Sequence, residues 1–180
     1  MISFKTFLEA KLAKNKWQKL LPHDHDEYHR DLIALVDKAY GHTTLGSFVK
    51  SLMDVKGSDW EVLSQDGDEI HDTVFFRKAR ANESWIGHKI QGIGHDGSRE
   101  GKNIVLTKLE DQLKISGWWI EASDALARAL IRRGVTPIQD EDILRTIFPS
   151  ILTVHDDGSY TRLVNGDEHV EYVFGNPVLK

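Results

Sequence analysis

The sequence predicts an α+β fold in which a mixed, mostly antiparallel sheet is flanked by helices and preceded by a helical N-terminal segment. Three observations support this prediction. Apolar residues in the first 21 positions recur every three or four residues, as on one face of a helix. From residue 60 onward, short alternating segments separated by turn residues indicate strands. Helical patterns lie between several of those strands.

The composition indicates one globular domain of 180 residues. The absence of cysteine excludes a disulfide scaffold, a thiolate nucleophile and a sulfur-ligated metal site. A net charge of −5 disfavours a protein whose whole surface binds nucleic acid. No apolar run reaches the roughly 18 residues that span a membrane, and no secretory signal is visible. We therefore expect a cytoplasmic protein.

The first segment, Met1–Leu21, is predicted to form an amphipathic helix. Such a helix either packs on its own domain or serves as a docking or targeting segment. Its opening residues, Met1–Glu9, resemble the short N-termini of many proteins of large tailed bacteriophages, some of which are directed into the prohead. This resemblance implies a phage-encoded protein in a bacterial host cytoplasm, and leaves packaging into the virion, with cleavage of the segment, as an open alternative.

Two further helices are expected in residues 22–59. The first runs through Asp31–Tyr40 and ends at Gly41, with acidic residues before it that suit a helix N-terminus. A shorter helix is predicted over Ser47–Val55, which has apolar residues on one side.

Residues 60–180 are predicted to form the sheet and the helices that cover it. Three strands come first as an antiparallel meander, over Trp60–Leu63, Thr73–Arg77 and Trp85–Gly94. The elements expected after the meander are a helix over Ile104–Leu113, a strand over Trp118–Ala122, helices over Ala125–Arg133 and Asp140–Phe148, a hairpin of Ile151–Val154 with Tyr160–Leu163, and a last strand over Val170–Phe174.

A glycine-bearing loop, His95–Asn103, joins the meander to the first of these helices. Exposed backbone N–H groups and the positive end of a helix favour a phosphate, and glycine lets it approach. Arg99 and Lys102 add positive charge. The spacing of Gly97 and Gly101 differs from that of a Walker loop. The alternative interpretation is a polar turn whose glycines only satisfy the backbone geometry.

From Trp60 onward, this order of elements resembles the Gcn5-related N-acetyltransferase (GNAT) superfamily. The resemblance implies that acetyl-CoA binds along Ile90–Gly94 and the loop that follows, with Trp118–Ser123 as the strand that splays away. The residues that it assigns to the cofactor are Ile93, Gly94, Gly97, Ser98, Arg99, Gly101, Lys102 and Asn103.

Acyl transfer requires a base that takes the proton of the amine. Glu121 is the first candidate, with Asp96 and His95 behind it, and the backbone N–H near Ile93 is placed to polarise the thioester carbonyl. The alternative for Glu121 is a helix cap or an ion pair. Many GNAT proteins carry a tyrosine on the helix after the splayed strand; residues 124–134 contain none, which leaves Tyr160 or Tyr172 as substitutes.

A histidine-rich stretch at residues 23–29 invites a metal interpretation, because His25 and His29 lie one helical turn apart. Such stretches are more often solvated helix entries, and we expect no metal.

The sequence therefore predicts transfer of an acetyl group from acetyl-CoA to an amine of a small molecule or peptide, by direct attack. The alternative is a catalytically inactive GNAT-fold phage protein that binds a host protein and neutralises a bacterial defence or toxin component. We expect no membrane or nucleic-acid partner, and a homodimer is possible through the C-terminal strands.

Overall fold

The computed structural model describes residues 12–20, 25–41, 43, 46–47, 51, 58–78 and 85–179. In this part of the chain the main sheet has eight strands in the order β1-β2-β3-β5-β6-β9-β8-β7. Their bounds, in that order, are Gln18–Leu20, Ser58–Leu63, Asp72–Lys78, His88–Gly94, Trp118–Ala122, Asp167–Gly175, Ser159–Val164 and Ile151–Val154. A separate pair joins β4 (Trp85–Ile86) to β10 (Val178–Leu179).

Neighbouring strands of the main sheet are antiparallel, except for the parallel pair β5 and β6. That pair is short. It joins His88, Lys89 and Ile90 to Trp118, Trp119 and Ile120, while β5 continues to Gly94 and β6 to Ala122. The two strands therefore diverge after Ile90 and Ile120, and the sheet is open between their C-terminal ends.

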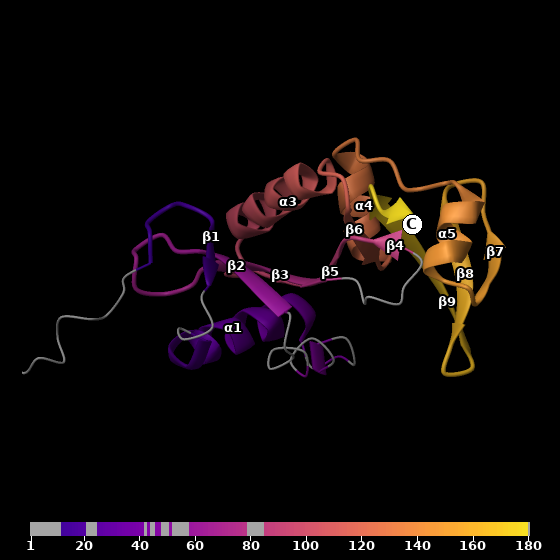
Figure 1. The fold of residues 1–180 in the computed structure, drawn as a ribbon. Helices are drawn as coiled ribbons and strands as arrows, with labels where there is room; N and C mark the ends of the chain where they lie inside the picture. Colours follow the sequence, from indigo (N-terminus) through magenta and orange to yellow (C-terminus); the bar gives the residue numbers. More distant parts are fainter. Residues whose placement is uncertain are drawn as a thin grey trace, which may run out of the picture.

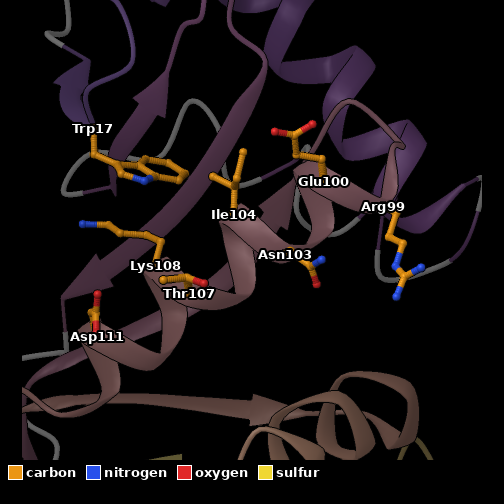
Figure 2. A pocket seen from close by; sticks show the side chains of 8 residues that line it. All are labelled: Trp17, Arg99, Glu100, Asn103, Ile104, Thr107, Lys108 and Asp111. Atoms are coloured by element: carbon orange, nitrogen blue, oxygen red, sulfur yellow. The ribbon is translucent and has the colours of Figure 1, made fainter.

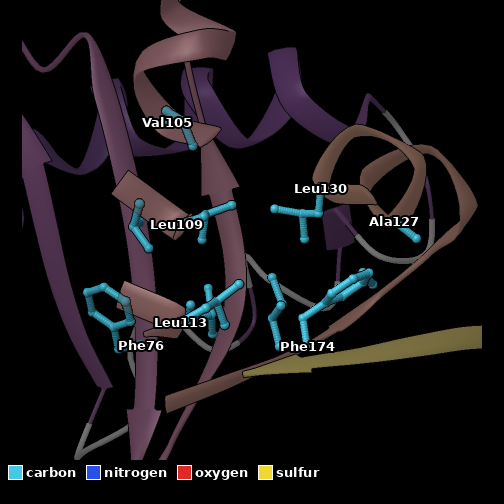
Figure 3. Close-up of a cluster of buried hydrophobic side chains, with 11 residues drawn as sticks. Phe76, Val105, Leu109, Leu113, Ala127, Leu130 and Phe174 are labelled. Atoms are coloured by element: carbon cyan, nitrogen blue, oxygen red, sulfur yellow. The ribbon is translucent and has the colours of Figure 1, made fainter. Parts of the chain in front are cut away.

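Helices cover both faces of this sheet. The long helix α3 (Arg99–Leu113) and α4 (Asp124–Arg132) lie on one face, and α1 (His25–Tyr40) lies on the other (Figure 1). Figure 3 shows the core beneath α3 and α4, where Val105, Leu109 and Leu130 meet side chains of the sheet. The short helix α5 (Glu141–Ile147) packs on Trp119, which alternates with Ile120 along β6 and so faces away from α3 and α4.

The structure confirms the α+β class and most of the predicted elements. The helix over Asp31–Tyr40, the meander, the strand over Trp118–Ala122 and the C-terminal hairpins form as expected. Ser123 is the N-cap residue of α4 and Asp140 that of α5, so α5 begins one residue later than predicted. These features have strong local signals, because alternation, cap residues and turn residues act over a few positions.

The predicted N-terminal helix over Met1–Leu21 is wrong for residues 12–20, and residues 1–11 and 21 lie outside the described residues. Asn15 adopts a positive φ of 55°, which interrupts a helix. The chain instead adds β1 to the edge of β2, where Leu20 pairs with Trp60 and is buried. A partner strand more than 35 residues away in sequence therefore overrides the local helical periodicity.

Three other boundaries differ from the prediction. The glycine loop is shorter than expected, because α3 begins at Arg99 and includes Gly101, Lys102 and Asn103. Gly87 divides the predicted strand Trp85–Gly94 into β4 and β5. Of the helix predicted over Ser47–Val55, Ser47 and Ser51 are helical and the other residues lie outside the described ranges.

Alanine substitutions at two glycines with positive φ distinguish the cost of backbone strain from the cost of a steric clash. Gly175 (φ +114°) packs so closely on β6 that an added Cβ would lie 2.3 Å from the Trp118 carbonyl oxygen, whereas Gly166 (φ +92°) faces open space. Gly166→Ala should lower the free energy of unfolding by about 1 to 3 kcal/mol, the cost of a positive φ. Gly175→Ala should lower it by about 1 to 3 kcal/mol more. Urea denaturation measures both, and equal losses would contradict the packing described here.

Candidate functional site

The first candidate site is the gap where β6 leaves β5. The backbone N–H of Ile93 donates to the hydroxyl oxygen of Tyr40, at an N–O distance of 2.9 Å. Because this N–H donates to a side chain and not to β3, it points to the edge of β5 that β6 has left. The predicted carbonyl-polarising N–H is therefore aimed into the gap, and a phenol from the C-terminus of α1 lies in front of it.

The second part of this site is the N-terminus of α3, where the chain fills the predicted phosphate position with its own groups. The carboxylate of Asp96 accepts from the backbone N–H of Ser98 at 2.7 Å and from its hydroxyl at 2.5 Å. The Ser98 hydroxyl oxygen accepts from the N–H of Gly101, and His95 accepts from the N–H of Gly97. Helix geometry leaves the first-turn N–H groups of Arg99 and Glu100 without an intrahelical partner.

A second carboxylate, Asp72, is buried beside Asp96 at the start of β3. No N–H or O–H of the described residues forms a well-aligned hydrogen bond with either of its oxygens. Burial, followed by the negative charge of Asp96, raises the pKa of Asp72 to about 6, although the nearby backbone N–H of Asp96 acts in the opposite direction. The hydrogen bonds from Ser98 lower the pKa of Asp96. His95 has a lowered pKa, because of burial and the charge of Lys102.

Two of the three glycines predicted to bind the cofactor have structural partners, while Gly97 faces open space. Gly94 lets α1 approach β5, since an added Cβ would lie 2.7 Å from the Cβ of Leu35. A Cβ on Gly101 would lie 2.3 Å from Oδ1 of Asp96 and 3.1 Å from Oδ1 of Asp72. Sequence reasoning had no means of identifying these contacts, because Leu35 and Asp72 are distant in the chain.

The remaining predicted cofactor residues, Arg99, Lys102 and Asn103, lie in the first turns of α3. Arg99 and Asn103 border a groove of about 660 Å³ along this helix (Figure 2). At the far end of the groove, the ammonium of Lys108 lies 5.6 Å from the centre of the Trp17 ring and pairs with Glu61. Because Glu61 belongs to β2, this end of the groove faces away from the gap between β5 and β6.

The third part of the predicted site is a cluster around Glu121. It lies on the face of the sheet opposite α3. The Glu121 carboxylate accepts from three groups, at 2.6 Å from Tyr160, 2.7 Å from Arg162 and 3.2 Å from Lys89. Arg162 also donates to Glu171, at 3.1 Å. Glu121 therefore lies apart from Asp96 and His95, which belong to the loop before α3.

The two carboxylates of this cluster titrate in opposite directions. Burial alone would raise the pKa of Glu121, but hydrogen bonds and the charges of Lys89 and Arg162 hold it well below its usual value. Burial, together with the negative charge of Glu121, raises the pKa of Glu171. A carboxylate that already accepts from three donors is a weak proton acceptor, so Glu171 is better suited than Glu121 to take a proton near neutral pH.

The site fits an acyl-CoA thioester if one side chain moves. The N–H of Ile93 suits a carbonyl oxygen, and the first turn of α3 suits a diphosphate. The Asp96 carboxylate occupies the place at the first turn of α3 that a diphosphate would take. A capping interaction contributes about 1 kcal/mol, and a factor of ten in affinity corresponds to about 1.4 kcal/mol. Turning Asp96 away would therefore weaken binding by roughly fivefold and would not exclude it.

Neither a metal site nor a membrane span emerges from the described residues. Nowhere in these ranges do three histidine, cysteine, aspartate or glutamate side chains gather as metal ligands would. The side chain of His25 lies outside the described set, so the absence of a metal stays a prediction. Among the helices that the structure describes, none combines the length and the apolar surface that crossing a bilayer requires.

Comparisons with known proteins find likeness in structure alone. No family model and no curated protein matches the sequence. A Gcn5-related N-acetyltransferase from Rhodopseudomonas palustris is similar, with 12% identity, a TM-score of 0.47, and 94% of this chain and 98% of that chain covered. So is the aminoglycoside 6'-N-acetyltransferase from Enterococcus faecium, with 12% identity, a TM-score of 0.44, and coverage of 92% and 98%. Likeness of this degree is no guide to substrate or activity.

The opposite pKa shifts of Asp72 and Asp96 predict opposite effects on stability. Because the pKa of Asp72 is raised from 3.8 to about 6, folding favours its protonated form, and this group destabilises the protein as the pH rises through that window. Asp72→Asn should therefore raise the free energy of unfolding at pH 7.5 by about 1 to 2 kcal/mol, and change it little at pH 4.

Asp96→Ala is the matched comparison, because the lowered pKa of Asp96 stabilises the folded state above about pH 4. This variant should lose about 1 kcal/mol at pH 7.5. Urea denaturation at the two pH values tests both variants. A loss of stability at pH 7.5 in Asp72→Asn as well would show that the buried carboxylate has partners that stabilise it.

Proposed function

We propose that this chain is a GNAT-like N-acyltransferase that moves an acyl group, in the simplest case acetyl, from acyl-CoA to an amine. The observation that carries the proposal is the open edge of β5. There, β6 diverges after three paired residues, and the N–H of Ile93 points into the resulting gap. The N-termini of α3 and α4 follow the C-terminal ends of these two parallel strands, so both lie at the same end of the gap.

Acyl-CoA would supply an acyl group already activated as a thioester. On the protein side, the N–H of Ile93 would bind the carbonyl oxygen. The N–H groups of Arg99 and Glu100 and the side chains of Arg99 and Lys102 would bind the diphosphate. The first turn of α4 offers further N–H groups, since its N-cap residue Ser123 makes no side-chain capping bond.

The acceptor amine would approach from the opposite face of the sheet, where the Glu121 cluster lies. Glu171 would take the proton of the amine, directly or through water. Glu121, held ionised by Lys89, Arg162 and Tyr160, would keep that proton acceptor in place. Because the chain has no cysteine, the amine would attack the thioester without a thiol intermediate on the protein.

A second candidate function is non-catalytic binding of another protein, which includes neutralising a bacterial defence or toxin component. The observation that favours it is the carboxylate of Asp96 at the α3 N-terminus, with Asp72 behind it. When the chain's own carboxylate occupies the diphosphate position, the fold suits a protein that does not bind acyl-CoA.

Calorimetry with acetyl-CoA separates the two candidates. The wild-type protein should bind it, and Asp96→Ala should bind roughly fivefold more tightly, because its helix N-terminus no longer holds a carboxylate that must leave. Asp111→Ala is the control, since it removes an exposed carboxylate near the other end of the same helix, and it should leave the affinity unchanged. Absence of binding by both wild type and Asp96→Ala would reject acyl transfer and favour the binding protein.

A further inference from the structure

Tyr40 contacts the open edge of β5, and sequence reasoning assigned it no role. It is the last residue of α1, and it reaches a strand 53 positions later in the chain. Its oxygen accepts from the N–H of Ile93, and no described residue accepts its own O–H proton. Among the described residues, this hydroxyl donor therefore has no acceptor, and it stands at the open edge of β5.

The surroundings of Tyr40 keep this hydroxyl protonated. Burial raises the pKa of Tyr40 to about 12, and the hydrogen bond from Ile93 offsets only part of that effect. A phenol whose oxygen accepts a hydrogen bond is also a better donor, because neighbouring hydrogen bonds polarise one another. The N–H of Ile93 and the O–H of Tyr40 thus form a two-step chain of donors that ends in the gap.

We propose that Tyr40 is a catalytic residue whose hydroxyl donates a hydrogen bond to the carbonyl oxygen of the acyl group bound between β5 and β6. This inference rests on the proposed acyl transfer. It also revises the role given to Ile93, whose N–H would then act on the carbonyl through Tyr40. The required donor comes from α1, a helix on the opposite face from α3 and α4.

The acidity of Tyr40 decides between donating a hydrogen bond and giving up its proton. A thiol has a pKa of about 8.5, more than three units below that of Tyr40, so protonation of a leaving thiolate by this phenol is strongly uphill. During transfer the C–N bond forms, the proton of the amine goes to Glu171, and the C–S bond breaks so that its electron pair leaves with CoA as a thiolate. Tyr40 keeps its proton throughout and stabilises the negative charge that grows on the carbonyl oxygen.

The test is Tyr40→Phe, which removes the hydroxyl and keeps the ring. Tyr28→Phe makes the same change on α1, within the core beneath that helix, and serves as the control. Calorimetry would compare acetyl-CoA with CoA for each protein. Infrared spectroscopy of acetyl-CoA labelled with ¹³C at the acetyl carbonyl would report the hydrogen bond to that oxygen directly.

The inference predicts that wild type and Tyr28→Phe bind acetyl-CoA more tightly than CoA, and that they shift the carbonyl band to lower wavenumber. Tyr40→Phe should bind CoA as the wild type does, lose roughly five- to tenfold in affinity for acetyl-CoA, and show no band shift. With any amine that is a substrate, kcat should fall by roughly 100-fold or more.

Other outcomes overturn the inference in distinguishable ways. Tighter binding of acetyl-CoA by Tyr40→Phe would mean that Tyr40 competes with the carbonyl for the N–H of Ile93. Unchanged binding and an unchanged band would make Tyr40 structural, while acyl-CoA binding itself stands. Failure of the wild type and of Asp96→Ala to bind either ligand would remove the proposed function, and the role of Tyr40 with it.

Discussion

The divergence of β5 from β6 is the constraint on which the site depends. Strands that separate leave backbone N–H groups without sheet partners, and a buried N–H must find another acceptor. Ile93 meets this requirement through Tyr40, which α1 can deliver only because Gly94 allows Leu35 to pack directly on β5. The close packing of α1 on β5 therefore determines which hydrogen-bonding groups the gap contains.

The same principle governs the N-terminus of α3. Its first N–H groups attract negative charge, and Asp96, which accepts from the N–H and the hydroxyl of Ser98, supplies that charge from within the chain. Around Gly101, the missing side chain makes room for this carboxylate and for Asp72. On the opposite face, Arg162 bridges Glu121 and Glu171, so that one carboxylate is held ionised and the other titrates closer to neutral pH.

Local signals predicted most of the fold. Alternation and turn residues located the meander and the hairpins. The errors came from distant contacts: residues 12–20 have a helical pattern, but Leu20 is buried as part of an edge strand beside Trp60. In the site, Glu121 and Asp96 were predicted from their positions beside a strand end and a helix start, and their roles stay predictions. Tyr40, Asp72 and Glu171 were missed, because each acts on residues brought near by the fold and carries no motif.

We propose that an acyl thioester binds at the open edge of β5 and the start of α3. Amide nuclear magnetic resonance of the ¹⁵N-labelled protein during titration with acetyl-CoA tests this claim most directly. The largest shift changes should fall on the N–H groups at this edge and helix start, those of Ile93, Arg99 and Glu100. Changes confined to the groove beside Trp17 and Lys108, or no changes at millimolar ligand, would contradict it.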